Sequence, residues 1–336
     1  MALYVLRRLL IFVPSLLLVS MVTFVMVRTA GGDPASLRLG LRGSAETLER
    51  MRREMGLADP WPVQYGRWLA GAVRGDLGRS YLTGTSVNQE ILLRLPATFQ
   101  LAVMSMAIAV PIGILVGTIS ALRPRTFVDN TAMVCGLVGI SVPTFWLGIL
   151  LIVLLAVWLQ WLPVAGSVDV HLGIRPVTGF SLVDGFAQGG WPALWDALQH
   201  LILPALTLAG WPMAIIARHM RSSLLEVLYQ DYIRTARAKG LGLVRLVWRH
   251  AFPNALIPVV AVTALETGYL LGGAVITETV FAWPGIGSLT IQAIARRDYM
   301  VVQGTVLLFA GVFATLNIVA DLIYAVLDPR IRYQSG

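Results

Sequence analysis

The sequence has 336 residues, of which 57% are hydrophobic and 13% are charged, with a net charge of +8. A soluble chain carries roughly 25% charged residues, so this chain has too little polar surface to cover a water-soluble globule. Disordered chains have the opposite composition and are also excluded. The single cysteine allows no internal disulfide, and no Cys/His cluster has the spacing of metal ligands. The composition therefore indicates an integral membrane protein.

Long uncharged stretches predict six membrane-spanning helices. A helix needs roughly 20 apolar residues to cross about 30 Å of hydrocarbon. The first stretch is longer than the apolar core of a secretory signal and has no clear cleavage site, so we expect it to be retained. We expect the spans within residues 9–27, 97–122, 133–158, 198–217, 255–279 and 301–326.

The distribution of Lys and Arg orients these spans. With the N-terminus inside, the inner segments carry 13 basic and 4 acidic residues, whereas the outer segments carry 13 basic and 12 acidic ones. The inner segments are about half as long, and the 28–94 loop is discounted because long loops are translocated regardless of charge. We therefore expect both termini in the cytoplasm. No basic groove with interleaved aromatic residues argues for nucleic acid.

Two outer segments are long enough to fold. Residues 28–94 contain predicted helices at 45–55 and 64–73, and Asp59-Pro60 between them is typical of a helix stop and a new start. The second segment, 161–197, is rich in glycine and tryptophan. Its tryptophans fit either an interfacial aromatic belt or contact with an external partner: Trp161, Trp191 and Trp195.

The inner segment 218–254 predicts a helix–turn–helix elbow. Apolar residues at loosely helical spacing lead to Gly240, which can cap a helix or form a tight turn. A second short amphipathic helix, at 243–248, precedes Pro253, where the next span opens. A basic segment held at the membrane surface by anionic lipid has the same composition. The residues alone leave both interpretations open.

The elbow also carries a recognisable string. It reads Asp231-Tyr232-Ile233-Arg234-Thr235-Ala236-Arg237-Ala238-Lys239-Gly240-Leu241 and ends at His250-Ala251-Phe252-Pro253. This resembles the signature loop of permease subunits in ABC importers, whose general form is Glu-Ala-Ala, three residues, Gly, nine residues and Ile-x-Leu-Pro. The Gly-to-Pro spacing is kept, while the Glu and the Ile are not. The longer string is similar to the version found in the dipeptide/oligopeptide/nickel branch.

Shorter motifs in the same order extend the resemblance over essentially the whole chain. They are Leu6-Arg7-Arg8-Leu9-Leu10, Gly32-Asp33-Pro34, Gly56-Leu57-Ala58-Asp59-Pro60, Gln64-Tyr65, Gly75-Asp76-Leu77-Gly78-Arg79-Ser80, His200-Leu201-Ile202-Leu203-Pro204, Glu278-Thr279-Val280-Phe281, Pro284-Gly285-Ile286-Gly287 and Asp328-Pro329-Arg330-Ile331-Arg332-Tyr333. The stretch 178–184 resembles dipeptide-type members more than oligopeptide-type ones. The chain thus resembles a B-type permease subunit of this branch.

The resemblance implies an all-α integral membrane protein with the six-helix architecture of type I ABC importer permeases. Its expected regions are the N-terminal end and first span (1–27), an extracytoplasmic loop domain (28–94) and the permease core (95–336), which includes the coupling loop 218–254. The implied location is the inner membrane of a prokaryote. The implied partners are a homologous second permease, two ATPase subunits, an extracytoplasmic substrate-binding protein and membrane lipid.

In such transporters the elbow sits in a groove on an ATPase subunit, so that closure of the ATPases moves the spans. The residues that the resemblance assigns to this contact are Asp231, Tyr232, Arg234, Thr235, Ala236, Arg237, Lys239, Gly240, His250 and Pro253. The cations suit acidic groove edges, while Tyr232, Ile233 and Ala236 are expected to supply apolar contact. Gly240 permits the turn.

The chain's own residues argue against an enzyme. A P-loop needs Gly-Lys-Ser/Thr, whereas the single lysine, Lys239, lies between Ala238 and Gly240. Neither His-Glu-x-x-His nor Gly-x-Ser-x-Gly occurs, and Cys135 is expected to be a packing residue in a span. We therefore expect no cofactor on this chain, and the resemblance implies that ATP and Mg²⁺ are bound by the partner ATPases.

Two acidic residues lie deep inside predicted spans, Glu266 and Asp321, whereas Glu278 falls at the outer end of the fifth. An ionisable group at a helix centre costs roughly 2.5–3.5 kcal/mol on insertion scales, so Glu266 should face protein or water. Its helical neighbours are Thr263, Tyr269, Leu270 and Gly273. That face either lines the translocation pathway, with Glu266 near a positive substrate end or a gate, or carries a structural carboxyl at the seam between permeases. Asp321 is expected to hydrogen-bond within the bundle.

Glycine and proline positions suggest two further features. The loop after the fifth span, with Glu278, Phe281, Pro284 and Gly285, is expected at the outer mouth, either as part of the gate or as a simple turn. Two glycine pairs have small-xxx-small spacing, which allows close helix approach. They are Gly113 with Gly117, and Gly268 with Gly272.

The sequence gives less support to two other functional classes. An autonomous channel or secondary carrier would not need the elbow, and a membrane enzyme would need a polar catalytic set, whereas only Glu266 and Asp321 are ionisable groups deep within the spans. The substrate stays open among dipeptides, longer peptides, heme, glutathione and nickel chelates, because similar permeases serve all of them.

Overall fold

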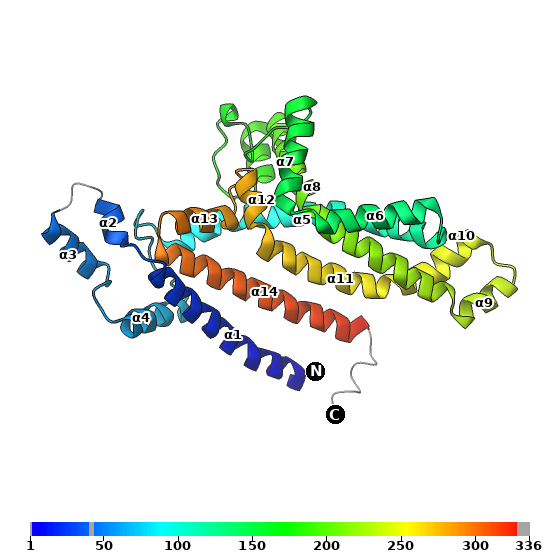
Figure 1. Ribbon diagram of the computed structural model, residues 1–336, viewed down its shortest axis with the longest axis horizontal. Helices are drawn as coiled ribbons and strands as arrows, with labels where there is room; N and C mark the ends of the chain where they lie inside the picture. Colours follow the sequence, from blue (N-terminus) through cyan, green and yellow to red (C-terminus); the bar gives the residue numbers. More distant parts are fainter. Residues whose placement is uncertain (1, 40–43, 328–336) are drawn as a thin grey trace. The chain divides into compact units, whose positions relative to one another are not determined.

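The computed structural model describes residues 2–39 and 44–327, and these residues are almost entirely helical (Figure 1). The α-helices are α1 (Ala2–Thr29), α2 (Pro34–Leu39), α3 (Ala45–Glu54), α4 (Trp61–Val73), α5 (Val87–Leu122), α6 (Phe127–Ser141), α7 (Thr144–Leu151), α8 (Ser181–Leu228), α9 (Asp231–Ala238), α10 (Leu243–Leu246), α11 (Phe252–Gly273), α12 (Val275–Val280), α13 (Ile286–Ala295) and α14 (Tyr299–Leu327). Short π-helical or 3₁₀ segments are η2 (Ile152–Trp158), η3 (Val170–Leu172) and η4 (Val247–Ala251).

Five of these helical stretches are long and apolar enough to span a membrane, and a bent pair makes six if it counts as one span. The stretches correspond to the predicted spans. The third span differs, because α6 and α7 meet at an angle of 106° instead of forming one straight helix. Pro143 explains the break, since it disfavours helical geometry in the preceding residue and Val142 is indeed extended (φ −79°, ψ 126°).

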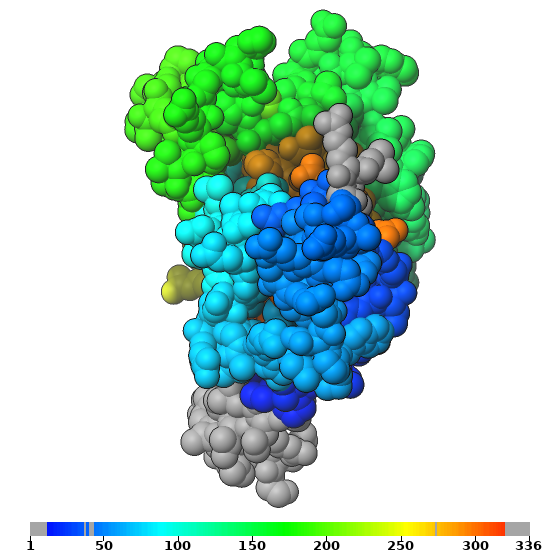
Figure 2. All heavy atoms as spheres, turned by 90° about the vertical axis from the view of Figure 1, so that its left-hand side faces the viewer, coloured from blue at the N-terminus to red at the C-terminus, as the bar shows by residue number. Residues whose placement is uncertain are grey.

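The predicted helices of the segment 28–94 are confirmed. Ser44 caps α3 by accepting the Thr47 N–H (3.2 Å), and α4 begins directly after Pro60. In Figure 2 atoms of this segment, coloured blue to cyan, lie beside one another on the face in view. The side chains of Arg7, Arg8 and Asp321 and the motif at 328–333 lie outside the described residues, so the predictions about them stay predictions.

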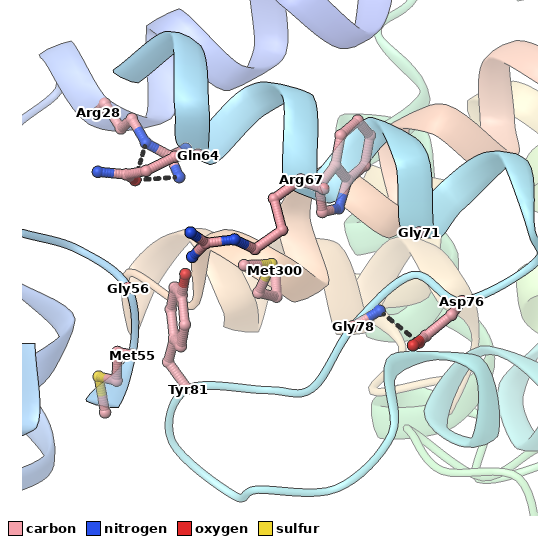
Figure 3. A pocket seen from close by; sticks show the side chains of 11 residues that line it. Arg28, Met55, Gly56, Gln64, Arg67, Gly71, Asp76, Gly78, Tyr81 and Met300 are labelled. Atoms are coloured by element: carbon pink, nitrogen blue, oxygen red, sulfur yellow. Dashed lines mark hydrogen bonds between the residues drawn. The ribbon is translucent and has the colours of Figure 1, made fainter. Parts of the chain in front are cut away.

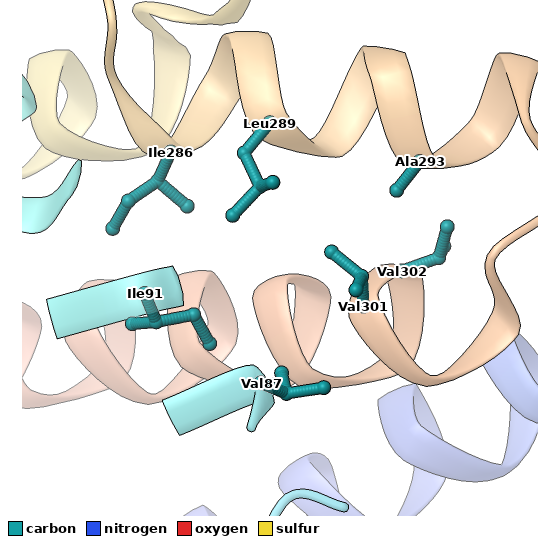
Figure 4. Packing of buried hydrophobic residues seen from close by; sticks show 7 residues of the cluster. All are labelled: Val87, Ile91, Ile286, Leu289, Ala293, Val301 and Val302. Carbon is teal, nitrogen blue, oxygen red and sulfur yellow. The ribbon is translucent and has the colours of Figure 1, made fainter. Parts of the chain in front are cut away.

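The described residues divide into two compact units. Unit 1 comprises those within 1–99, 166–197 and 282–314, and unit 2 comprises those within 100–165, 198–281 and 315–336. The core of unit 1 joins the start of α5, α13 and the start of α14 (Figure 4). Its buried members are Val87, Ile91, Ile286, Leu289, Ala293, Val301 and Val302.

Close approach of α5 to α8 defines the packing of unit 2. A Cβ on Gly117 would lie 2.4 Å from the Ala217 carbonyl oxygen, and one on Gly113 would lie 2.8 Å from that of Met213. This glycine pair therefore serves helix contact, as its spacing predicts. The second pair serves it only in part: a Cβ on Gly268 would lie 3.3 Å from the Leu316 side chain, whereas one on Gly272 would meet no other helix of the described residues within 4 Å.

Cys135 departs from its predicted packing role. Its side chain is exposed on the described part of the chain. The α6 face that carries it is therefore open, and Val134 and Val138 beside it are exposed as well.

Candidate functional site

The elbow is built from the end of α8, the short helix α9 and a turn that leads into α10 (Figure 1). Gly240 ends α9 with φ +82°, a conformation that side chains other than glycine rarely adopt, and its N–H donates to the Arg237 carbonyl (3.0 Å). The predicted role of this glycine as a helix end is confirmed. Ser223 fastens the base of the elbow, because its hydroxyl donates to the Ala255 carbonyl (2.9 Å) and so joins α8 to α11.

The second arm of the elbow is longer than predicted. Helix α10, the π-helical turn η4 and α11 form one continuous apolar stretch, Leu243–Gly272, so no separate short helix ends before Pro253. Pro253 has no N–H to donate one turn back, and the chain responds with a π-helical turn rather than a break. Helix α10 is thus joined to a spanning helix without an intervening loop.

Most residues predicted to contact a partner are exposed. Exposed side chains on α9 and its turn are Asp231, Tyr232, Arg234, Thr235, Arg237 and Lys239, and Pro253 is exposed as well, whereas Ala236 and His250 are half-buried. Arg234 pairs with Asp231 (3.3 Å), and the Tyr232 hydroxyl accepts from Asn254 (3.2 Å).

Ile233 does not have its predicted role. Its side chain is 0% exposed, so it anchors α9 to the rest of the chain and cannot offer apolar contact to a partner. Exposed apolar side chains come from other positions of the elbow, which sequence spacing did not single out. They are Tyr229, Leu243, Val244 and Trp248, in addition to Tyr232. We name this set, together with Arg234, Arg237 and Lys239, the elbow surface. Exposed apolar residues beside cations are typical of an interaction site.

An ion pair between a half-buried arginine and a buried carboxylate braces the helices that lead into the elbow. Arg221 on α8 donates to both oxygens of Asp129 in α6, and Ser120 at the end of α5 donates to the same carboxylate. This brace lies seven residues before the end of α8. The sequence showed Arg221 only as one of several basic residues, and nothing in it pointed to a partner 92 positions away.

The α11 residues that were predicted to line the pathway differ in how far they are exposed. Glu266 is half-buried, and its Oε2 atom has no hydrogen-bond partner. Tyr269 is exposed and stacks on Trp211 at 6.5 Å, whereas Leu270 is buried. Leu270 therefore does not line an open passage in this structure, while Thr263 and Glu266 stay half-buried.

The segment 278–287 is a packed connection rather than an exposed tip. Glu278 and Phe281 are 0% and 1% exposed, and Phe281 packs on Ala156 and Leu203. Pro284 is exposed and Gly285 is buried. Trp283 is fully buried, which the sequence did not predict.

No group of three or more His, Cys, Asp or Glu side chains that could hold a metal ion occurs among the described residues. The spans and the elbow surface together define a multi-pass helical membrane protein with exposed apolar and basic residues on the elbow.

Comparison with known proteins identifies the family. A family model described as "binding-protein-dependent transport system inner membrane component" matches residues 109–333. A second model, for the N-terminal part of such membrane components, matches residues 1–102. The chain belongs to this family, whose members are multi-pass inner-membrane permeases of ABC importers with the type I architecture. The resemblance seen in the sequence is thus confirmed.

Relatives match along their whole length. The chain is 44% identical to the di/tripeptide transport system permease protein DppB of Pseudomonas aeruginosa. It is 43% identical to the dipeptide transport system permease protein DppB of Escherichia coli K12 and 42% identical to that of Alkalihalophilus pseudofirmus. Each match covers 98% of this chain and 99% of the relative.

Proposed function

We propose that this chain is one permease subunit of an ATP-driven importer of short peptides and forms half of the translocation pathway. The relatives named for dipeptide and tripeptide transport support the substrate class, since the match extends over nearly the whole of each chain. A homologous second permease supplies the other half of the pathway. An extracytoplasmic binding protein delivers the peptide, and two ATPase subunits drive the cycle.

The elbow surface carries this proposal. Its apolar side chains and cations suit a groove with apolar walls and acidic edges on an ATPase subunit. Because α10 continues into α11, a displacement of the elbow moves a spanning helix directly. ATP and Mg²⁺ are bound by the ATPases, and this chain binds no cofactor and hydrolyses nothing itself.

Charge reversal on α9 tests the docking. The double variant Arg234→Glu/Arg237→Glu should lose most of its co-purification with tagged ATPase subunits, because two exposed cations become anions facing acidic edges. Arg123→Glu is the matched control, since it reverses an exposed cation outside the elbow. Recovery of the ATPases by the double variant at the level of the control would contradict the proposal.

The proposal places both termini and the elbow in the cytoplasm. The charge asymmetry of the short segments supports this orientation. In a Cys135→Ser background, Ser44→Cys should react with a membrane-impermeant maleimide added to intact spheroplasts, whereas Lys239→Cys should react only after lysis. The reverse pattern would invert the topology.

Competition between unlabelled compounds for uptake tests the substrate assignment. Uptake by the reconstituted transporter should be inhibited by unlabelled dipeptides and tripeptides and not by heme, glutathione or a nickel chelate. Inhibition by one of the latter group, with no effect of peptides, would leave the importer proposal intact and replace its substrate.

Glu266, Tyr269, Glu278, Phe281, Pro284 and Gly285 are proposed to belong to the pathway or its gate. The unpartnered carboxylate oxygen of Glu266 supports this for α11. The burial of Glu278 and Phe281 is consistent with a closed gate and equally with a structural connection.

A further inference from the structure

A cavity of about 200 Å³ lies in unit 1, beside the end of the first span (Figure 3). Side chains from α1, α4, the segment after α4 and the start of α14 line it, among them Arg28, Arg67, Trp68, Tyr81 and Met300. The sequence analysis gave none of these five residues a specific role. The cavity is separate from the elbow and from the predicted pathway residues.

Arg28 enters this cavity with an incomplete set of partners. Its Nε and Nη2 atoms donate to the Gln64 side-chain oxygen at 3.1 and 2.9 Å, while its Nη1 atom is buried and has no hydrogen-bond partner among the residues that the structure describes. The guanidinium lies 3.5 Å from the centre of the Phe24 ring. That contact uses the face of the guanidinium, so the in-plane N–H groups of Nη1 still need an acceptor.

Gln64 is fixed so that it cannot neutralise this charge. Its amide nitrogen donates to the carbonyls of Leu57 (3.1 Å) and Asp59 (2.7 Å), which leaves its oxygen toward Arg28. A neutral amide accepts two hydrogen bonds from Arg28 but supplies no counter-charge. A half-buried guanidinium without a counter-charge carries a desolvation cost that an anion would offset.

Further donors line the same cavity. Trp68 is 6% exposed, and its indole Nε1 atom is buried without a partner. Burial raises the pKa of Tyr81 to about 12, so its hydroxyl stays protonated and can donate. Figure 3 shows this hydroxyl pointing toward the Arg67 side chain.

Two carboxylates lie near the cavity, and neither contacts Arg28. Asp59 pairs with Arg67 at 2.8 Å, and Asp76 accepts the Gly78 N–H at 2.9 Å on the side away from Arg28 (Figure 3). Neither carboxylate is paired with Arg28, and among the described residues the Arg28 Nη1 and Trp68 Nε1 donors have no acceptor, a set that suits an oxyanion with several oxygens.

The position of the cavity indicates where the oxyanion comes from. Arg28 stands in the last turn of α1, at the end of the apolar span Phe12–Thr29. Side chains exposed along that span are Val13, Leu17, Leu18, Met21, Val22, Val25 and Met26. The end of a span lies at the level of the lipid headgroups. The geometry points to a binding site for the phosphate of an anionic phospholipid headgroup, held by Arg28 and Trp68.

Lipid retention by the purified full chain tests the site. Native mass spectrometry, after equilibration with phosphatidylglycerol or phosphatidylcholine, should show preferential retention of phosphatidylglycerol by the wild type. Arg28→Gln should lower this retention about tenfold or more, because a charge-assisted hydrogen bond is lost. Trp68→Phe keeps the ring and removes only the N–H group, and should lower retention severalfold. Arg50→Gln, on an exposed arginine of α3 outside the cavity, is the control.

Three results would overturn the assignment. Equal retention of phosphatidylglycerol by Arg28→Gln and Arg50→Gln, with Trp68→Phe also unchanged, would show that the cavity holds no headgroup. Equal retention of both lipids by the wild type would remove the requirement for an anionic headgroup. Displacement of phosphatidylglycerol by millimolar inorganic phosphate would show a site for free anions instead.

Discussion

The guanidinium of Arg221 binds the carboxylate of Asp129 through two parallel contacts, Nε to Oδ1 at 2.6 Å and Nη2 to Oδ2 at 2.7 Å. Asp129 is 2% exposed and also accepts the Arg125 N–H (2.9 Å). Bidentate pairs of this kind fix orientation as well as distance. The pair therefore holds α6 and α8 in a set position shortly before the chain turns into the elbow.

Removing the charge of Asp129 should destabilise the protein. Asp129→Asn leaves Arg221 without its counter-charge, and breaking a buried pair typically costs about 3–5 kcal/mol. Because the Arg221 side chain is 28% exposed and can recover some hydration, we expect the lower end of that range. Thermal unfolding of the detergent-purified chain measures the change.

Asp231→Asn is the matched control for this experiment. Asp231 also pairs with an arginine, Arg234, but both side chains are exposed. Exposed pairs contribute little to stability, so the unfolding midpoint should not move. Equal unfolding midpoints for Asp129→Asn and Asp231→Asn would show that the Asp129–Arg221 ion pair does not stabilise the protein.

The contact between α5 and α8 should be intolerant of a single methyl group. In Gly117→Ala the new Cβ would lie 2.4 Å from the Ala217 carbonyl oxygen, which is a backbone atom and cannot turn aside. We expect lower yield of folded protein and a lower unfolding midpoint. Gly272→Ala is the control, because nothing lies within 4 Å of its Cβ position. A Gly117→Ala variant as stable as Gly272→Ala would contradict the observed helix approach.

The spans were predictable because apolar length is a local property of the sequence. The bend between α6 and α7 was missed although Pro143 marks it, since the uncharged stretch continues on both sides and its length alone suggested one helix. Periodicity placed Ile233 on an apolar position of α9. It could not show whether that position faces a partner or the chain itself.

The cavity beside Arg28 was beyond sequence reasoning for a different reason. Arg28 and Gln64 are 36 residues apart, and Arg28 follows an apolar span where basic residues serve topology. Its unpaired nitrogen becomes visible only when the folded neighbours are known. The same holds for the brace, where Asp129 and Arg221 come from separate helices.

Transport by Glu266→Gln tests the proposed pathway on α11. If the carboxylate meets the positive end of a peptide or a gate, uptake of dipeptides should fall severalfold and its dependence on pH should change. Glu46→Gln on the exposed face of α3 is the control. Uptake at the wild-type rate with unchanged pH dependence would assign Glu266 a structural role.

Trp283 fastens the connection before α13 to the start of α5. Its indole N–H donates to the Ala97 carbonyl (2.9 Å), and nearby the Ile286 N–H donates to the Thr98 hydroxyl (2.9 Å). Trp283→Phe removes one hydrogen bond and leaves a small void, and Thr98→Val leaves a buried N–H unpaired. Each change should lower stability by about 1–3 kcal/mol.

The two changes should not be additive, because they release the same connection. The double variant Trp283→Phe/Thr98→Val should therefore lose less stability than the two single losses combined. Pro284→Ala alters an exposed residue of the same connection and should leave the unfolding midpoint unchanged. Additive losses, or a Pro284→Ala effect as large as that of Trp283→Phe, would show that the two hydrogen bonds do not stabilise the connection jointly.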